Sequence, residues 1–194
     1  MLTSKEKILG KAIVLFAEKG YSGLSMRQLA TAVDMSVAAI YHHFPDKKAL
    51  YLDAIRFAFS GKELVFAKIW ESDGAPEQKL RQFVRSLLEV MLQDREFHRL
   101  MQREIMEADP ERMQLLAQGV FKNQFCSLMQ LATELAPQLD AHLVATSIIG
   151  LVKNYIDYQP LHQNFPGWKL ENQKPDVIAK HITELLLNGL RASN

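Results

Sequence analysis

The sequence has a single cysteine, Cys126, in 194 residues, so no disulfide can form within the chain, and a reducing compartment is expected. Glycine and proline are few, with 9 and 7 residues, and the polar-apolar alternation of strands is almost absent. No apolar run approaches the roughly 20 residues that span a bilayer, and the N-terminus lacks the apolar region of a signal peptide. These absences predict an all-α, cytoplasmic protein with no membrane partner.

Neither positive nor negative charge predominates in the sequence. The 23 Lys and Arg residues nearly balance the 22 Asp and Glu residues, which leaves a net charge of +1 and no overall preference for nucleic acid. Residues 1–56 are mildly basic, with eight Lys or Arg against five Asp or Glu. The chain is 48% hydrophobic, which is enough to bury a core. The composition therefore predicts an ordinary globular protein whose N-terminal part is the more basic one.

Motifs of catalysis and metal binding are missing as well. The sequence has no glycine-rich phosphate loop, no nucleophile elbow, no Cys-x-x-Cys and no His, Cys, Asp and Glu at metal-ligand spacing. The adjacent His42 and His43 diverge by about 100° on a helix, so they do not share a ligand face. These absences argue against an enzyme, including one that carries the segment at residues 25–48 as an accessory. We therefore expect no catalytic residue, cofactor or metal.

Residues 25–48 contain two short helical patterns that are separated by a tight turn. Ser25 and Gln28 form a capping box at the start of the first, where each side chain can bind a backbone N–H that the helix leaves free. From Val37 onward, the second pattern has apolar residues at positions i, i+3, i+4 and i+7. Pro45 ends it, because a residue before proline is disfavoured in the α region. This arrangement is typical of a helix-turn-helix, which inserts its second helix into the major groove of DNA.

Two lysines occupy the start of the next expected helix. Asp46 is the expected N-cap, which places Lys47 and Lys48 in the first turn. Lysine is disfavoured there because the N-terminal end of the helix dipole is positive. A DNA phosphate at this position would be attracted by the lysines, the dipole and the free N–H groups together. Three short amphipathic helices can also form a plain bundle, and the lysines favour DNA binding over that alternative.

Three stretches of the sequence are shared with a known family: residues 24–30 (LSMRQLA), residues 35–36 (MS) and residues 40–47 (IYHHFPDK). They resemble the DNA-binding domain of the TetR family of bacterial transcriptional regulators, over roughly residues 4–55. The resemblance implies a homodimeric, all-helical regulator, usually a repressor that a small ligand releases from a palindromic operator. It implies a three-helix DNA-binding domain, residues 1–48, and a helical ligand-binding and dimerisation domain, residues 49–194.

The resemblance assigns DNA contacts to Ser25, Arg27, Ser36, Val37, Ala38, Ala39, Tyr41, His42, His43 and Lys47. Tyr41 could instead pack within the domain. Asp34 stands where the family usually has glycine, and aspartate tolerates a left-handed backbone better than most residues. The second helix of the motif lacks the Arg, Asn and Gln side chains that make bidentate base contacts. We therefore expect base readout to rest on thymine-methyl contacts from residues 37–39, together with Arg27 and His42.

Proline, glycine and capping residues divide the rest of the chain into long helical segments. About nine helices are expected in all, including a first helix that runs from a capping box at Thr3 to a stop at Gly20. The helices after the DNA-binding motif are expected at residues 47–71, 76–93, 97–108, 110–136, 141–158 and 175–190. Residues 159–174, with two prolines and a glycine, are expected to form a loop.

The last two long helices carry wide apolar stripes. The resemblance implies that such helices pair across a two-fold axis into a four-helix bundle, and a symmetric dimer is what a palindromic operator requires. The predicted interface residues are Leu143, Ile148, Leu151, Tyr155, Ile178, Ile182, Leu185 and Leu186. The same stripes could also be the core of one chain.

The middle helices are rich in methionine and phenylalanine, which suit an adaptable pocket for an apolar effector. The predicted pocket residues are Phe83, Leu87, Met91, Met101, Ile105, Phe121, Phe125 and Met129. Polar residues that could orient the effector are Arg81, His98, Arg103, Glu104 and Asn123. All of them suit an ordinary core equally well. The predicted function is a ligand-controlled regulator that binds a double-stranded DNA operator, and a helical protein without a DNA role is the remaining alternative.

Overall fold

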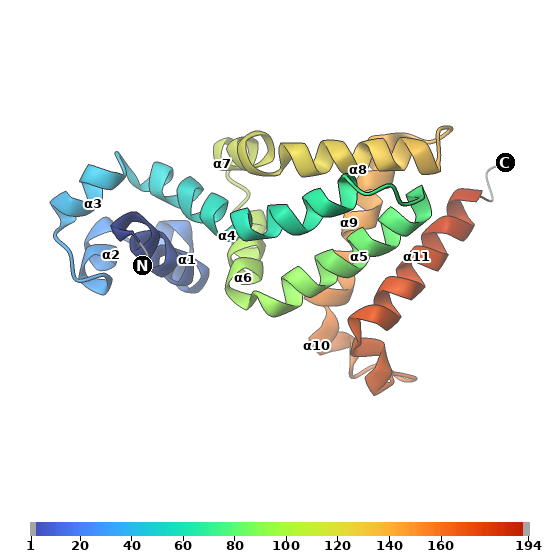
Figure 1. Ribbon diagram of the computed structural model, residues 1–194. Helices are drawn as coiled ribbons and strands as arrows, with labels where there is room; N and C mark the ends of the chain where they lie inside the picture. The colour runs from blue at the N-terminus through green and yellow to red at the C-terminus, as the bar shows by residue number, and fades with distance from the viewer. Residues whose placement is uncertain (1–2, 192–194) are drawn as a thin grey trace. The chain divides into compact units, whose positions relative to one another are not determined.

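The computed structural model describes residues 3–191, and all regular structure in this range is helical, with no strand (Figure 1). The predicted all-α fold class is therefore confirmed. In chain order the elements are α1 (Ser4–Gly23), α2 (Met26–Ala32), α3 (Val37–His43), α4 (Lys47–Trp70), α5 (Pro76–Gln93), α6 (Arg95–Glu107), α7 (Pro110–Leu116), the π-helical turn η1 (Ala117–Phe121), α8 (Lys122–Leu135), α9 (Ala141–Asp157), α10 (Gln159–His162), the 3-10 turn η2 (Leu170–Gln173) and α11 (Pro175–Arg191). Among the described residues, no helix is both long enough and apolar enough to cross a bilayer.

The helices belong to two compact units. The first unit comprises Met1–Glu63 and Asp94–Lys122, and the second comprises Leu64–Gln93 and Asn123–Asn194. The chain passes from one unit to the other within α4, which is a single helix. The predicted boundary after residue 48 lies in the first turn of α4 and remains a prediction.

The first unit is built from α1, α2, α3, the first part of α4, α6 and α7. The capping box predicted for α1 is present: Thr3 Oγ1 accepts a hydrogen bond from the Glu6 N–H at 3.2 Å, and Glu6 Oε2 accepts one from the Thr3 N–H at 2.7 Å. α1 packs against α2 and α6. The side chains that fill this core are Ile8, Phe16, Leu29, Ile40, Phe44, Leu50, Ile55, Phe97 and Leu100. Helical spacing of apolar residues on each element therefore accounts for the unit.

The second unit has α5 and α11 side by side, with α9 packed against both (Figure 1). Its core side chains include Leu80, Val84, Leu88, Leu128, Leu131, Val144, Val152 and Ile156. The expected loop after α9 contains two short helical pieces, α10 and η2. Gly167 has a φ of 84° between them, a left-handed conformation that favours glycine.

The helix expected at residues 110–136 is interrupted. α7 and α8 are joined by the π-helical turn η1, and the chain remains helical from one to the other. A π turn inserts a residue into the α-helical repeat, so the apolar face rotates between the two helices. Apolar spacing alone did not predict this insertion.

Candidate nucleic-acid interface

The helix-turn-helix has the geometry that its caps predict. Ser25 Oγ accepts a hydrogen bond from the Gln28 N–H at 3.2 Å, and Gln28 Oε1 accepts one from the Ser25 N–H at 2.9 Å. Asp34 has a φ of 55°, so the left-handed turn forms without glycine. Ser36 then caps α3 by accepting a hydrogen bond from the Ala39 N–H at 3.1 Å. Backbone groups and short caps thus fix the turn, and the outer side chains of α3 take no part in it.

One side of α3 is buried and the other is open to solvent. Ile40 and Phe44, with 0% and 1% exposure, hold α3 in the first unit, whereas Tyr41 is 47% exposed. Of the other predicted contact residues, the exposed ones are Ser25, Arg27, Ser36, Ala38 and His42, and the half-buried ones are Val37, Ala39, His43 and Lys47. The exposure of Tyr41 argues against the alternative that its side chain belongs to the core.

The two lysines at the start of α4, Lys47 and Lys48, are called the lysine pair below. Asp46 caps α4 as predicted, since its Oδ1 accepts a hydrogen bond from a backbone N–H three residues later at 2.7 Å. Lys47 Nζ lies 4.5 Å from the ring centroid of Tyr21, within the range of a cation–π contact. Lys48 Nζ forms an ion pair with Glu111. Both lysines thus contact protein groups with which a DNA phosphate would compete.

These surroundings shift the pKa values of both amines. Partial burial lowers the pKa of Lys47 from its ordinary value of 10.5, the charge of Glu107 opposes this shift, and the charge of Arg112 adds to it. The hydrogen bond to Glu111 raises the pKa of Lys48. A phosphate beside Lys47 would favour its charged form and offset the effect of burial.

A charge network, formed by the buried Tyr51, Glu104 and Arg112 and the exposed Glu107, lies within the first unit. Glu104 is 0% exposed, and its carboxylate accepts a hydrogen bond from Tyr51 Oη at 2.5 Å and one from Arg112 Nε at 2.9 Å. Arg112 Nη2 also pairs with Glu107 Oε2 at 2.9 Å. The Arg112 guanidinium carbon lies 4.2 Å from the centroid of the Tyr21 ring, which the first lysine of the pair also contacts. The charge network therefore extends from α6 to the start of α4.

Protonation in this network is matched to its hydrogen bonds. Burial raises the pKa of Tyr51, and the hydrogen bond to Glu104 raises it further. Burial alone would lower the pKa of Arg112, but the hydrogen bond and charge of Glu104 raise it overall. The Glu104 carboxylate thus favours a neutral Tyr51, whose hydroxyl donates a hydrogen bond to it, and a charged Arg112.

Gly20 brings α1 close to this network. It has a φ of 74° and a ψ of 173° where the sequence predicts a stop, and helical turns resume as far as Gly23. A Cβ at position 20 would lie 2.6 Å from Glu107 Oε1, the oxygen that accepts a hydrogen bond from the Tyr21 N–H at 3.3 Å. Arg103 adds hydrogen bonds of 2.7 and 2.8 Å to two carbonyl groups near the end of α1. The absence of a side chain at position 20 permits these contacts.

The sequence did not predict the charge network. It suggested that Arg103 and Glu104 could orient an effector, whereas both bind protein groups of the first unit. No role was predicted for Tyr21, Tyr51, Glu107 or Arg112. The indication available in the sequence is that Glu104 falls on the apolar face of α6, seven residues after Phe97 and four after Leu100.

The predicted effector-pocket residues are divided between the two units. Phe83 and Leu87 are buried in the second unit, and Ile105, in the first, is 50% exposed. The others are half-buried, with Met101 and Phe121 in the first unit and Met91, Phe125 and Met129 in the second. A pocket formed by these residues remains a prediction.

The predicted dimer residues all lie in the second unit and differ in how far they are buried. Ile148 and Ile182 are 0% exposed and Ile178 is 7% exposed, so these three contribute to the core of a single chain. Leu143 and Leu185 are 64% and 52% exposed and line an apolar groove of about 480 Å³ between α9 and α11. Leu186 also lines this groove, and it is half-buried, as are Leu151 and Tyr155.

The chain matches two family models. Residues 8–54 match the bacterial regulatory proteins of the tetR family. Residues 76–192, more than half of the chain, match the C-terminal domain of the HTH-type transcriptional dual regulator CecR.

Comparison with individual proteins gives a short sequence match and longer structural ones. IcaR, the negative transcriptional regulator of the biofilm operon icaADBC in Staphylococcus aureus (strain Newman), is 40% identical over 55 residues, which are 28% of this chain and 30% of IcaR. The structure of FadR from Bacillus subtilis with stearoyl-CoA has a TM-score of 0.77, 17% identity and coverage of 94% of this chain and 97% of FadR. The structure of AibR with isovaleryl coenzyme A and operator DNA has a TM-score of 0.69, 22% identity and the same coverages. At these identities the structural similarity shows the fold alone.

The backbone at Gly20 can be tested by substitution. Gly20→Ala would place a Cβ against Glu107 and force alanine into a region of φ and ψ that favours glycine. We expect the free energy of unfolding to fall by about 1–3 kcal/mol, as measured by urea denaturation followed by helical circular dichroism. Gly10→Ala is the matched control, because a Cβ there has no atom within 4 Å and lies inside α1. Equal stability of the two variants would contradict the account of Gly20.

The charge network gives a second prediction. Glu104→Gln removes the charge that Arg112 Nε contacts and leaves Glu107 and Asp109 as the remaining acidic partners of this buried guanidinium, so we expect a loss of about 1–3 kcal/mol in the free energy of unfolding. Glu89→Gln, which breaks the exposed pair of Glu89 with Arg85 (3.0 Å), should cost less than about 1 kcal/mol. The same urea titration measures both. A Glu104→Gln protein as stable as Glu89→Gln would show that the buried pair does not stabilise the unit.

Proposed function

Because this chain belongs to the TetR family of bacterial transcription regulators, we propose that it binds a palindromic DNA operator as a homodimer and that a small molecule controls the binding. The observation that carries this proposal is the exposed face of α3, which follows a capped turn and is held in place by Ile40 and Phe44. The major groove admits one α-helix presented in this way. Because bacterial operator DNA lies in the cytoplasm, we propose that the protein is located there.

The proposed contacts are mainly with the DNA backbone. Ser25, Tyr41 and Lys47 would bind phosphates and so fix the register of α3 on the duplex. The methyl groups of Val37 and Ala38 would meet thymine methyls in the major groove. With so few base-reading side chains, much of the sequence preference would come from the shape and deformability of the operator.

Control of DNA binding is proposed to act through the charge network. Arg112 on α7 and Lys47 on α4 contact the same ring, that of Tyr21. A displacement of α6 or α7 would move Arg112 and change the position and charge environment of Lys47. An effector that favours one placement of α6 and α7 would therefore change the affinity for DNA. The largest possible change equals the ratio of the effector's affinities for the two placements.

The proposed direction of control is repression that the effector relieves. The description of IcaR as a negative regulator supports it, whereas the CecR description, a dual regulator, would also allow activation. FadR and AibR were each solved with a thioester of coenzyme A. A mainly apolar effector would suit the predicted pocket, whose second-unit residues include the buried Phe83 and Leu87.

The homodimer is proposed to form through the outer faces of α9 and α11. Leu143 and Leu185 leave apolar area exposed on these helices, and a groove runs between them. Such an area is expected to be covered in solution. A symmetric pair would present two copies of α3, and each would read one half-site of a palindrome.

The phosphate contact gives a prediction about salt. Lys47→Gln removes one positive charge from the proposed interface, so binding should weaken on operator and random DNA alike. The slope of log affinity against log salt concentration should decrease in magnitude by about 1. Fluorescence anisotropy with labelled DNA at several salt concentrations measures both quantities.

Lys180→Gln is the matched control for this measurement, since Lys180 is an exposed lysine of α11 in the second unit. It should leave the affinity and the salt slope unchanged. If Lys47→Gln behaved like Lys180→Gln, the proposed phosphate contact would be wrong.

The proposed dimer interface can be tested by charge. Leu143→Arg combined with Leu185→Arg should give a protein with the mass of one chain, 22.1 kDa, by light scattering after size exclusion, where the wild type has twice that mass. Leu64→Arg is the control, because Leu64 is 67% exposed and lies on α4. A dimer that persists in the double variant would place the interface elsewhere.

A further inference from the structure

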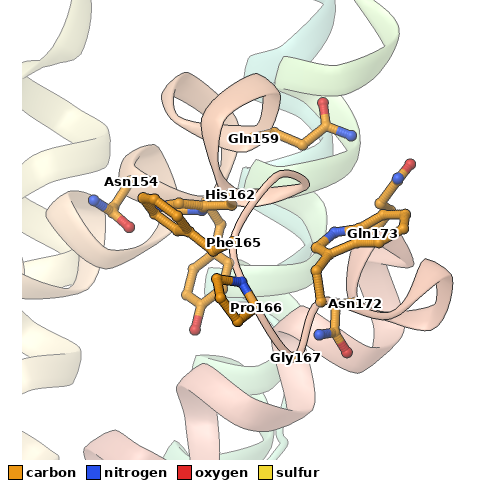
Figure 2. A pocket seen from close by; sticks show the side chains of 10 residues that line it. Asn154, Gln159, His162, Phe165, Pro166, Gly167, Asn172 and Gln173 are labelled. Atoms are coloured by element: carbon orange, nitrogen blue, oxygen red, sulfur yellow. The ribbon is translucent and has the colours of Figure 1, made fainter.

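A second pocket of the second unit lies apart from the apolar groove. It has a volume of about 400 Å³ and is formed by the end of α9, α10, the following loop and η2 (Figure 2). Its lining residues are Asn154, Tyr155, Gln159, His162, Phe165, Pro166, Gly167, Trp168, Asn172 and Gln173. It is called the carboxamide pocket below. None of the predicted DNA contacts lines it, and of the predicted dimer and effector residues only Tyr155 does.

The lining of the carboxamide pocket has no formal charge. It contains no Lys, Arg, Asp or Glu. A phosphate or carboxylate placed inside would lose its hydration without gaining a cation. The pocket therefore favours an uncharged ligand group.

Aromatic rings supply flat surfaces within the pocket. The ring centroid of His162 lies 6.2 Å from that of Tyr155 and 6.1 Å from that of Phe165. Trp168 follows Gly167, whose φ of 84° turns the loop at that point. Rings at these positions can stack on a planar ligand, and base–aromatic stacking is a sequence-tolerant source of binding energy.

Four carboxamide side chains complete the lining: Asn154, Gln159, Asn172 and Gln173. Within residues 3–191 their side-chain amides form no hydrogen bond. In Figure 2, Asn154 lies on one side of the His162 ring, and Asn172 and Gln173 lie on the other. Each amide offers two donors and an acceptor. The pocket thus combines ring faces with hydrogen-bonding groups that have no partner in the protein.

We propose that the carboxamide pocket binds an adenine-type nucleobase, in which an uncharged aromatic ring carries adjacent donors and acceptors on its edge. Asn and Gln side chains bind adenine in a bidentate way, and aromatic side chains stack on its faces. Asn154 and Asn172 are exposed and Gln159 and Gln173 half-buried, so an aliphatic ligand would displace water from these amides without replacing its hydrogen bonds. Two sources share this chemistry: a free nucleoside, and the adenine end of a phosphorylated cofactor whose phosphates remain in solvent.

This proposal is independent of DNA binding and goes beyond the proposed function. The predicted effector is mainly apolar, and the residues predicted to bind it do not line the carboxamide pocket. A nucleobase site would give the protein a second ligand of a different class.

Tryptophan fluorescence of the full-length protein tests the proposal. The chain has 2 tryptophans, so Trp70→Phe leaves Trp168, in the pocket, as the sole emitter. With excitation at the tryptophan band, adenosine should change the emission saturably. Replacement of both Asn172 and Gln173 by alanine should weaken the apparent affinity about tenfold or more. Gln163→Ala is the matched control, since Gln163 is exposed and does not line the pocket.

The outcomes distinguish the two sources and can overturn the proposal. Tighter binding of adenosine than of adenosine monophosphate would indicate a free nucleoside, and equal binding would indicate the adenine end of a phosphorylated cofactor. Calorimetry on the unsubstituted protein replaces fluorescence if Trp70→Phe does not fold. The proposal is wrong if neither compound binds saturably, if the Asn172 and Gln173 double variant binds as the Gln163→Ala control does, or if glucose binds and adenosine does not.

Discussion

The buried carboxylate of Glu104 is the constraint on which the first unit depends. A charge removed from water is tolerated only when hydrogen bonds and an opposite charge compensate it, and Tyr51 and Arg112 supply both. These partners come from α4 and α7, so the carboxylate fixes how α4, α6 and α7 pack within the unit. Arg112 then lies against Tyr21, whose ring also contacts Lys47. The position of the proposed phosphate-binding lysine therefore follows from a charge buried in α6.

Local chemistry made the helix-turn-helix predictable, whereas the charge network was not. The caps at Ser25 and Ser36 act over three residues, and the left-handed turn at Asp34 depends on one residue. The hydrogen bond between Tyr51 and Glu104 joins residues that are 53 positions apart. A pattern of apolar spacing indicates that Glu104 is buried, but it carries no information about which helix supplies the partner.

The apolar stripes of the last long helices illustrate the same limit. Helical periodicity correctly marks α9 and α11 as carrying apolar faces. Each stripe is wide enough to serve two surfaces, with Ile148 and Ile182 in the core and Leu143 and Leu185 exposed. Only the packed structure separates the two groups. No periodic pattern indicated the carboxamide pocket, because most of its lining residues lie in the short helical pieces and loop that connect α9 to α11.

We propose that α3, positioned by the buried core and the lysine pair, reads a palindromic operator. The most direct test is selection of genomic fragments by the purified full-length protein, followed by sequencing and affinity measurement at several salt concentrations. We expect enrichment of a palindrome whose half-site centres lie roughly 34–36 Å apart or at a multiple of that distance. We also expect the affinity for this sequence to fall steeply as salt rises, while remaining above that for random DNA. Equal binding of random and selected fragments at every salt concentration would contradict this proposal.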